Sequence, residues 1–442
     1  MLRMNGKSFR NCDGVPRRNF LQIGAPLLGL GLADLLQLEA GASEQGRAAS
    51  GKSLIVIWTE GGISQQDTWD LKPTAPVDYR GMYGPIATNV PGLVLGERIP
   101  RQAQLMDKLS LVRSVHHENG IHAPSAHWMQ TGYFGPTLAR NAPQKPCFGS
   151  VVSRSLGSRR PPMPAYITIP KLQAFGYQGA VYLGKAYNPF EVGADPNADD
   201  FKVPNLSLPD GLTENSVDAR RKLLATFDTI RRDIDESGVM EGLDTFKGQA
   251  LEMVSGDDMR AAFDLTAESP ELRDRYGRHQ FGQSALLARR LVEAGARCVN
   301  INTGYWDHHN DLEKGLEDLL PPLDSAIATL VEDLDERGLL DDVIVYCVGE
   351  FGRTPRMNGH AGRDHWSDCF SVLLAGGGIQ GGRVVGASEK WGGGVADRLV
   401  TPLDLLATIY SRMGIPLDTH YIDGSGRPVS IVGGGKPIGE LV

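Results

Sequence analysis

Residues 54–58 read Leu-Ile-Val-Ile-Trp and are followed at once by Thr-Glu-Gly-Gly at positions 59–62. A short uninterrupted apolar run rich in β-branched residues is typical of a strand that is buried on both faces of a parallel sheet. The glycines indicate a turn directly after the strand. Loops that follow parallel strands commonly carry ligand sites, so Glu60 is the first candidate site residue, with a carboxylate suited to a metal.

Similar short runs recur along the chain and alternate with helical patterns. Strands are predicted at 110–115, 166–169, 297–303, 343–348 and 370–375, and helices at 217–234, 286–292 and 405–413. Alternating strands and helices predict an α/β fold with a mostly parallel central sheet and helices on both faces. We predict a single domain over residues 43–442, with an inserted subregion near 161–281.

The N-terminus carries an export pattern. Residues 16–22, Pro-Arg-Arg-Asn-Phe-Leu-Gln, resemble the twin-arginine consensus, and 23–33 form an apolar stretch. That stretch is too short to cross about 30 Å of hydrocarbon, and residues 40–42, Ala-Gly-Ala, offer a cleavage site. We predict a signal peptide at 1–42, export by the twin-arginine translocase, and a periplasmic or secreted protein with no stable membrane span. An amphipathic anchor is the alternative.

The charge balance excludes some partners. The 442 residues include 53 acidic and 45 basic side chains, which give a formal net charge of -8. A mild acidic excess without a Lys/Arg run argues against nucleic acid or an anionic membrane surface as the main partner.

Histidines gather after the predicted strand at 110–115. Residues 116–127 contain His116, His117, His122 and His127. Solvated histidine pairs do occur, but four in so short a segment favour a functional site.

A second polar group follows the predicted strand at 297–303. Asp307 and His309 stand two residues apart, so in extended geometry both face the same side while His308 faces away. Carboxylate with imidazole is a donor set typical of zinc, manganese or iron.

Two more groups lie near the last strands. Glu350 and Arg353 follow the strand at 343–348, and His365 precedes the strand at 370–375. A guanidinium group suits an oxyanion such as phosphate or sulfate, although a salt bridge from Arg353 to a carboxylate is the alternative. Because loops at the carboxyl ends of parallel strands share one edge, we expect Glu60, Asp307 and Glu350 to converge there.

These motifs together resemble the family known as domain of unknown function 1501, which comprises sulfatase-like exported proteins. The resemblance covers roughly residues 53–413 and implies an alkaline phosphatase-like fold. Its carriers are the glycine turn with Ser64 and Asp67-Thr68, Trp306-Asp307-x-His309, residues 350–355 (Glu-Phe-Gly-Arg-Thr-Pro) and residues 362–365 (Gly-Arg-Asp-His).

The comparison with sulfatases proper bears on the nucleophile. Sulfatases carry Cys-x-Pro-Ser-Arg and then Thr-Gly at a fixed distance, whereas this chain reads His-Ala-Pro-Ser-Ala at 122–126 and Thr-Gly at 131–132. His122 thus stands where the cysteine matured to formylglycine would be, and Ala126 replaces the supporting arginine. The resemblance implies that a formylglycine mechanism does not operate.

The same resemblance implies a ligand set for a divalent metal, with zinc, manganese or calcium expected. Phe351 occupies the place of one further ligand. The implied metal ligands are Glu60, Asp307, His309, Glu350 and His365.

The predicted function is hydrolysis of a phosphate or sulfate ester of a small molecule or glycan, with Arg353 orienting the oxyanion. Ser125, Ser64 or a metal-bound water are the candidate nucleophiles, and His122 or His127 the candidate proton carriers. The alternative is a catalytically degenerate envelope binding protein of the same fold. An exported oxidoreductase has no support from a haem or dinucleotide motif.

Overall fold

The central sheet of the protein is built around the strand predicted first. The computed structural model describes residues 51–135, 144–172, 175, 178–204 and 257–442. The predicted export signal and the predicted helix at 217–234 lie outside these residues. Residues Gly51–Val442 form one compact unit.

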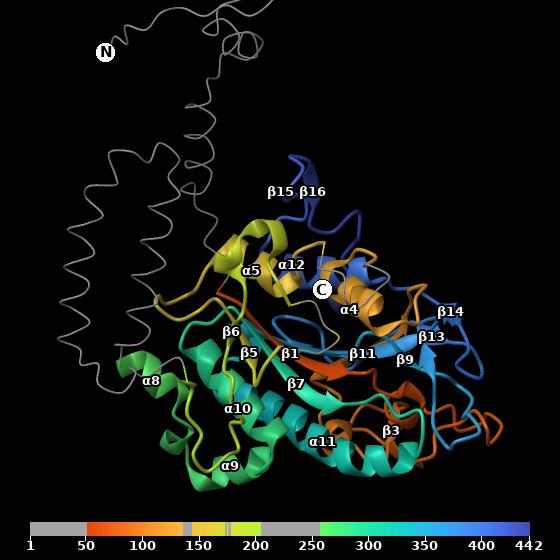
Figure 1. Ribbon diagram of the computed structural model, residues 1–442. Helices are drawn as coiled ribbons and strands as arrows, with labels where there is room; N and C mark the ends of the chain where they lie inside the picture. The colour runs from red at the N-terminus through yellow and green to blue at the C-terminus, as the bar shows by residue number, and fades with distance from the viewer. Residues whose placement is uncertain (1–50, 136–143, 173–174, 176–177, 205–256) are drawn as a thin grey trace, which may run out of the picture. The chain divides into compact units, whose positions relative to one another are not determined.

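Eight strands form this sheet (Figure 1). In spatial order they are β12 (Arg383–Val385), β4 (Leu109–Val115), β11 (Phe370–Gly376), β8 (Val343–Val348), β1 (Ser53–Glu60), β7 (Cys298–Tyr305), β5 (Tyr166–Ile169) and β6 (Phe190–Glu191). All neighbouring pairs are parallel except those that involve β11, which runs antiparallel to both β4 and β8. The predicted strands are therefore confirmed, and β5 and β6 show that part of the stretch near 161–281 belongs to the main sheet.

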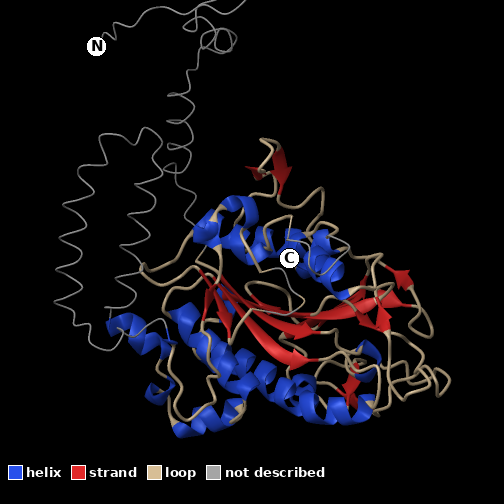
Figure 2. Cartoon of the chain, in the orientation of Figure 1, coloured by secondary structure: helices blue, strands red, loops and turns tan. Residues whose placement is uncertain are grey.

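Helices cover both faces of the sheet, which confirms the predicted α/β class (Figure 2). On one face lie α4 (His122–Thr131), α5 (Phe148–Leu156) and α12 (Pro402–Arg412); on the other lie α10 (Gln280–Glu293) and α11 (Leu312–Glu336). The other α-helices among the described residues are α3 (Pro100–Gln104), α8 (Asp257–Phe263) and α9 (Pro270–Tyr276). None of the helices in the described part of the chain is long and apolar enough to cross a membrane.

Alternation along β1 divides the interior into two cores. Ile55 and Ile57 pack with the α10 and α11 side, whereas Val56 and Trp58 pack with the α4, α5 and α12 side. Successive side chains of a strand point to opposite faces, so an uninterrupted apolar run buries both.

Small two-stranded sheets form outside the central sheet. They pair β2 (Pro85–Ala87) with β3 (Val94–Gly96), β9 (Gly352–Arg353) with β10 (His365–Trp366), β13 (Ala387–Ser388) with β14 (Val395–Asp397), and β15 (His420–Ile422) with β16 (Pro428–Ser430). The β9–β10 pair matters most for the site, because it places Arg353 opposite His365.

Candidate metal centre

The polar segments converge at one edge of the sheet. The parallel strands β1, β7 and β8 all end there, at Glu60, Tyr305 and Val348. Because β11 is antiparallel, its first residue, Phe370, pairs with Val115 at the end of β4. The segments before β11 and after β4 therefore reach the same edge, and they bring His365 and His122 with them.

A glycine allows the close approach of two of these segments. Gly61 has a φ of +101°, and a Cβ atom there would lie 2.6 Å from the backbone nitrogen of Asp307. Its own N–H donates to Glu350 Oε1 at 2.8 Å. Any larger residue would push the turn after β1 away from Asp307, which explains the glycine at this position.

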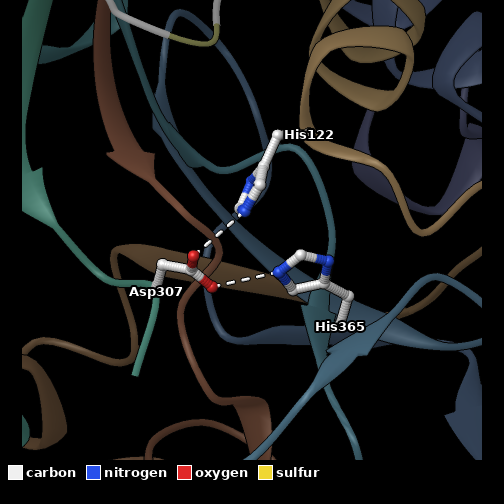
Figure 3. Close-up of side chains that lie close together, drawn as sticks. All are labelled: His122, Asp307 and His365. Carbon is white, nitrogen blue, oxygen red and sulfur yellow. Dashed lines mark hydrogen bonds and ion pairs between the residues drawn. The ribbon is translucent and has the colours of Figure 1, made fainter. Parts of the chain in front are cut away.

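Asp307 is the centre of the site (Figure 3). Its Oδ1 lies 3.0 Å from the Nε2 atoms of both His365 and His309 and close to a guanidinium nitrogen of Arg353. Its Oδ2 accepts from the Tyr305 hydroxyl at 2.8 Å. Burial alone would raise the pKa of Asp307, but its hydrogen bonds to His122 and His365 and the charge of Arg353 hold it far below the usual range.

His122 joins two carboxylates. Its Nε2 lies 3.1 Å from Asp307 Oδ2, and its Nδ1 lies 2.7 Å from Glu350 Oε1. Its ring stacks on Phe175 with 4.2 Å between centroids. Burial would lower the pKa of His122, but the hydrogen bonds to Asp307 and Glu350 raise it to about 9. A ring that donates both N–H groups holds the two carboxylates together.

His309 and His365 are arranged as metal ligands. Their Nε2 atoms lie 3.0 Å apart. The opposite ring nitrogens contact acceptors, because His309 Nδ1 lies 2.7 Å from Asp364 Oδ1 and His365 Nδ1 lies 2.7 Å from the Gly120 carbonyl oxygen. Because each Nδ1 has an acceptor for a ring proton, both Nε2 atoms, which lie beside Asp307 Oδ1, are positioned to ligate a cation when one is bound.

These residues fit a divalent metal. Asp307 Oδ1 and the Nε2 atoms of His309 and His365 lie 3.0 Å from one another, and a ring nitrogen of His122 lies within 4.8 Å of ligand atoms of Asp307 and His365. Glu350 is fully buried, and no described residue donates to its Oε2. Carboxylate and imidazole donors suit zinc or manganese. Of the predicted ligands, the structure brings together Asp307, His309, His365 and, through His122, Glu350.

Phe351 occupies one side of this centre. Its ring stacks on His365 with 4.5 Å between centroids and lies 5.0 Å from the ring of His122. The resemblance placed Phe351 where a further metal ligand would stand. An aromatic ring supplies no such ligand, so the geometry favours one cation bound by Asp307, His309 and His365.

Glu60 forms hydrogen bonds with two neighbouring segments. Its Oε1 accepts from the backbone N–H of Phe175 at 2.7 Å, and its carbonyl oxygen accepts from Trp306 N at 2.7 Å. These bonds fasten the end of β1 to Phe175, whose ring stacks on His122, while the metal-ligand role of Glu60 stays a prediction.

Ser125 and His127 form hydrogen bonds with backbone carbonyl groups. Ser125 is buried and donates to the Asn119 carbonyl oxygen at 2.7 Å, and His127 Nδ1 lies 2.8 Å from the Tyr133 carbonyl oxygen. Burial lowers the pKa of His127. The Ser125 hydroxyl and one ring nitrogen of His127 are thus engaged by backbone carbonyl groups, which does not favour Ser125 as nucleophile or His127 as proton carrier. Ser64, the other candidate, donates to Asp67 at 2.5 Å.

Arg353 is occupied by the protein itself. It is fully buried, and its Nε donates to the Gly62 carbonyl oxygen at 3.1 Å and its Nη1 to that of Arg363 at 3.0 Å. Its Nη2 donates to Gly61 and to Asp307. The geometry favours the alternative interpretation, a salt bridge, over direct contact with a substrate oxyanion.

Asp364 and Tyr305 contact the centre but were not among the predicted site residues. Both bind residues of the centre, and Asp364 directly precedes a predicted ligand, His365. That adjacency was the available signal for Asp364. For Tyr305 the signal was its position two residues before Asp307.

Fold and site thus define an α/β protein with a carboxylate and imidazole centre at the carboxyl edge of its sheet. The chain belongs to the family described as "Protein of unknown function (DUF1501)", whose model matches residues 51–442. It is also similar to human arylsulfatase A, with 32% identity over 126 residues, which are 27% of this chain and 24% of that protein. The chain therefore aligns with about a quarter of this relative.

Solved structures with detectable similarity include a sulfatase from Pseudoalteromonas sp., with 12% identity, a TM-score of 0.37 and coverage of 86% of this chain and 70% of that one. Another is the phosphonate monoester hydrolase of Agrobacterium radiobacter, with 12% identity, a TM-score of 0.33 and coverage of 88% and 78%.

Proposed function

We propose that this protein is an exported, metal-dependent hydrolase of phosphate or sulfate esters with an alkaline phosphatase-like architecture and no formylglycine nucleophile. The observation that carries the proposal is the pair of histidine Nε2 atoms, 3.0 Å apart, that meet at Asp307 Oδ1. The local sequence similarity to an arylsulfatase supports ester hydrolysis as the reaction class.

Asp307, His309 and His365 would hold the cation. When bound, a divalent metal supplies Lewis-acid polarisation of the ester and lowers the pKa of a water molecule. Asp364 and the Gly120 carbonyl oxygen orient the two imidazole rings, and His122 fixes the carboxylates of Asp307 and Glu350. Phe175 and Phe351 pack against His122 and exclude water from that side.

The attacking group is proposed to be water. His122 replaces the sulfatase cysteine and is bound to two carboxylates, while Ser125 and Ser64 are bonded elsewhere. Among the described residues, no serine or threonine hydroxyl contacts Asp307, which leaves direct hydrolysis rather than a covalent intermediate as the proposed course.

Metal content tests the proposal. We expect the mature protein, purified without chelator, to contain one zinc or manganese ion per chain by elemental analysis and to cleave at least one of p-nitrophenyl phosphate, bis-p-nitrophenyl phosphate and p-nitrophenyl sulfate. A His309→Ala, His365→Ala variant should lose both properties. His420→Ala is the matched control, because this exposed histidine of β15 lies outside the centre. Metal-free wild-type protein would contradict the proposal.

A degenerate binding protein is the second candidate. It is favoured by Arg353, whose guanidinium is occupied by backbone carbonyls and Asp307, and by Ala126 in place of the sulfatase arginine. This candidate predicts a metal-loaded protein without turnover on any of the three esters.

A further inference from the structure

A cleft of about 690 Å³ opens beside the metal centre. Its walls come from residues 354–359, from Asp364 and Trp366, and from the connection between β13 and β14. Asp364, which holds His309 Nδ1 at 2.7 Å, is part of the wall. The cleft therefore begins one side chain away from a proposed metal ligand, and its volume lies in the range of small-molecule sites.

Aromatic rings give this cleft flat apolar surfaces. Tyr79, Trp366 and Trp391 line it, and the rings of Tyr79 and Trp391 lie 5.3 Å apart. Trp391 is 45% exposed, which is unusual for so large an apolar side chain. Trp366 Nε1 donates to the Gly393 carbonyl oxygen at 2.8 Å, so this indole is held in position.

Polar groups with unused hydrogen-bonding capacity surround these rings. No described residue donates to Asp364 Oδ2 or to Glu389 Oε1, although the other oxygen of each carboxylate accepts a hydrogen bond. Arg356 is exposed, and its nearest described carboxylate, that of Asp78, is 3.8 Å away. The cleft thus offers both acceptors and a donor around an aromatic surface.

The combination of aromatic rings, two carboxylates and a guanidinium restricts the chemical class of ligand that the cleft can bind. A wholly apolar ligand would leave the carboxylates and the guanidinium desolvated without partners, which is costly. A polyanion would meet Asp364 and Glu389 as like charges. A sugar ring satisfies both constraints, because its C–H face packs on a flat aromatic ring while its hydroxyls donate to carboxylates and accept from a guanidinium.

We propose that this aromatic cleft binds a sugar ring of a carbohydrate ester, and so places the ester of a neighbouring ring at the metal centre. The inference rests on the proposed hydrolase function for the ester, while sugar binding itself depends only on the cleft.

Calorimetry on the mature protein tests the inference, with the uncharged hexasaccharides of cellulose, mannan and agarose as probes. We expect at least one hexasaccharide to bind, Trp391→Ala to weaken its binding at least tenfold, and Trp391→Phe, which keeps a ring, to stay within threefold of wild type. Because Trp391 is exposed, both variants should melt at the wild-type temperature.

His309→Ala separates the two proposals. It should bind the hexasaccharide as wild type does while losing metal and ester hydrolysis. Absence of binding by every hexasaccharide at millimolar concentration, or equal binding by Trp391→Ala, would overturn the sugar subsite. Binding that depends on Trp391, in a metal-loaded protein that cleaves no ester, would support the subsite and refute the hydrolase.

Discussion

Asp307 shows how single atoms define the site. One of its carboxylate oxygens meets two imidazoles and a guanidinium, while the other meets Tyr305 and His122. Five partners for one carboxylate exceed what a surface aspartate needs, and two of them, His309 and His365, are the proposed metal ligands. The positions of His309 and His365 therefore depend on what fixes their opposite ring nitrogens.

Asp364 holds the ring of His309 in position through Nδ1. Asp364→Ala should weaken zinc binding roughly 10- to 100-fold, because His309 loses the acceptor that orients its ring. Competition with a fluorescent zinc chelator measures the affinity. Asp341→Ala, at an exposed carboxylate that precedes β8 and so lies at the opposite end of that strand from Glu350, is the control. An unchanged affinity in the Asp364 variant would show that Asp364 does not position the ligand.

Among the secondary-structure elements, β11 is decisive for the site because it runs antiparallel to its neighbours β4 and β8. It brings the segment before this strand to the edge where β1, β7 and β8 end. A buried ion pair ties two of these segments together, since Arg363 Nε lies 2.9 Å from Asp67 Oδ2 and both side chains are fully buried. Asp67 Oδ1 also accepts from Met82 N at 2.8 Å.

The second prediction is that Asp67→Ala lowers the free energy of unfolding by about 3–5 kcal/mol, because it leaves the Arg363 guanidinium buried without its counter-charge. Urea unfolding followed by tryptophan fluorescence measures this. Glu440→Ala, which breaks the exposed pair with Arg398, should cost about 0–1 kcal/mol. Equal effects of the two variants would contradict the argument from burial.

The third prediction concerns the packing of α10 near α11. Glu268 pairs with Arg289 and Arg290 of α10. Burial would raise the pKa of Glu268, but the hydrogen bond from Arg290 and the charge of Arg289 lower it below the ordinary 4.5. A depressed folded-state pKa gives stability that is complete above the unfolded pKa and is lost as the pH falls through the folded pKa.

Glu268→Gln should therefore melt below wild type at pH 7, and this difference should shrink as the pH falls below about 4.5. Scanning calorimetry from pH 7 to pH 3 measures it. Glu271→Gln, at an exposed position of α9, provides the baseline. A difference that stays constant over this range would rule out the charged pair as its cause.

For the molecule as a whole, the fold and the proposed export are complementary. The proposed ligands come from different segments: Asp307 and His309 follow β7, and His365 precedes β11. They meet only after the sheet has formed. A protein whose metal site exists only in the folded state benefits from export after folding. The metal can then bind in the cytoplasm, before the protein is exported. The proposed twin-arginine route is of this kind.

The fourth prediction tests that route. Replacing both Arg17 and Arg18 by lysine should retain the protein in the cytoplasm, because the signal is read by a receptor rather than by charge alone. Cell fractionation with immunoblotting measures its location. Arg10→Lys, which preserves charge elsewhere in the leader, should leave export intact. Continued export of the double variant would refute the route.

The sequence alone determined the class of fold and most of the site's composition. Uninterrupted apolar runs such as 54–58 specify buried parallel strands locally, so the strands and the α/β class followed from pattern. α11 escaped notice, because Pro321 and Pro322 lie inside it and proline ordinarily predicts a helix boundary. Asp307, His309 and His365 were recognised because metal-binding residue types at strand ends are visible in one dimension.

Only the tertiary structure decided which of these residues work together. Ser125, His127 and Arg353 carry suitable chemistry, yet Ser125 and His127 bond to backbone carbonyl groups and Arg353 to backbone carbonyl groups and Asp307, partners that no spacing reveals. His122 changed from a candidate proton carrier into a bridge between carboxylates that lie 185 and 228 residues away in the chain. Residue type and periodicity are local properties, whereas direction, burial and hydrogen-bond partners depend on strands that meet only when the chain has folded.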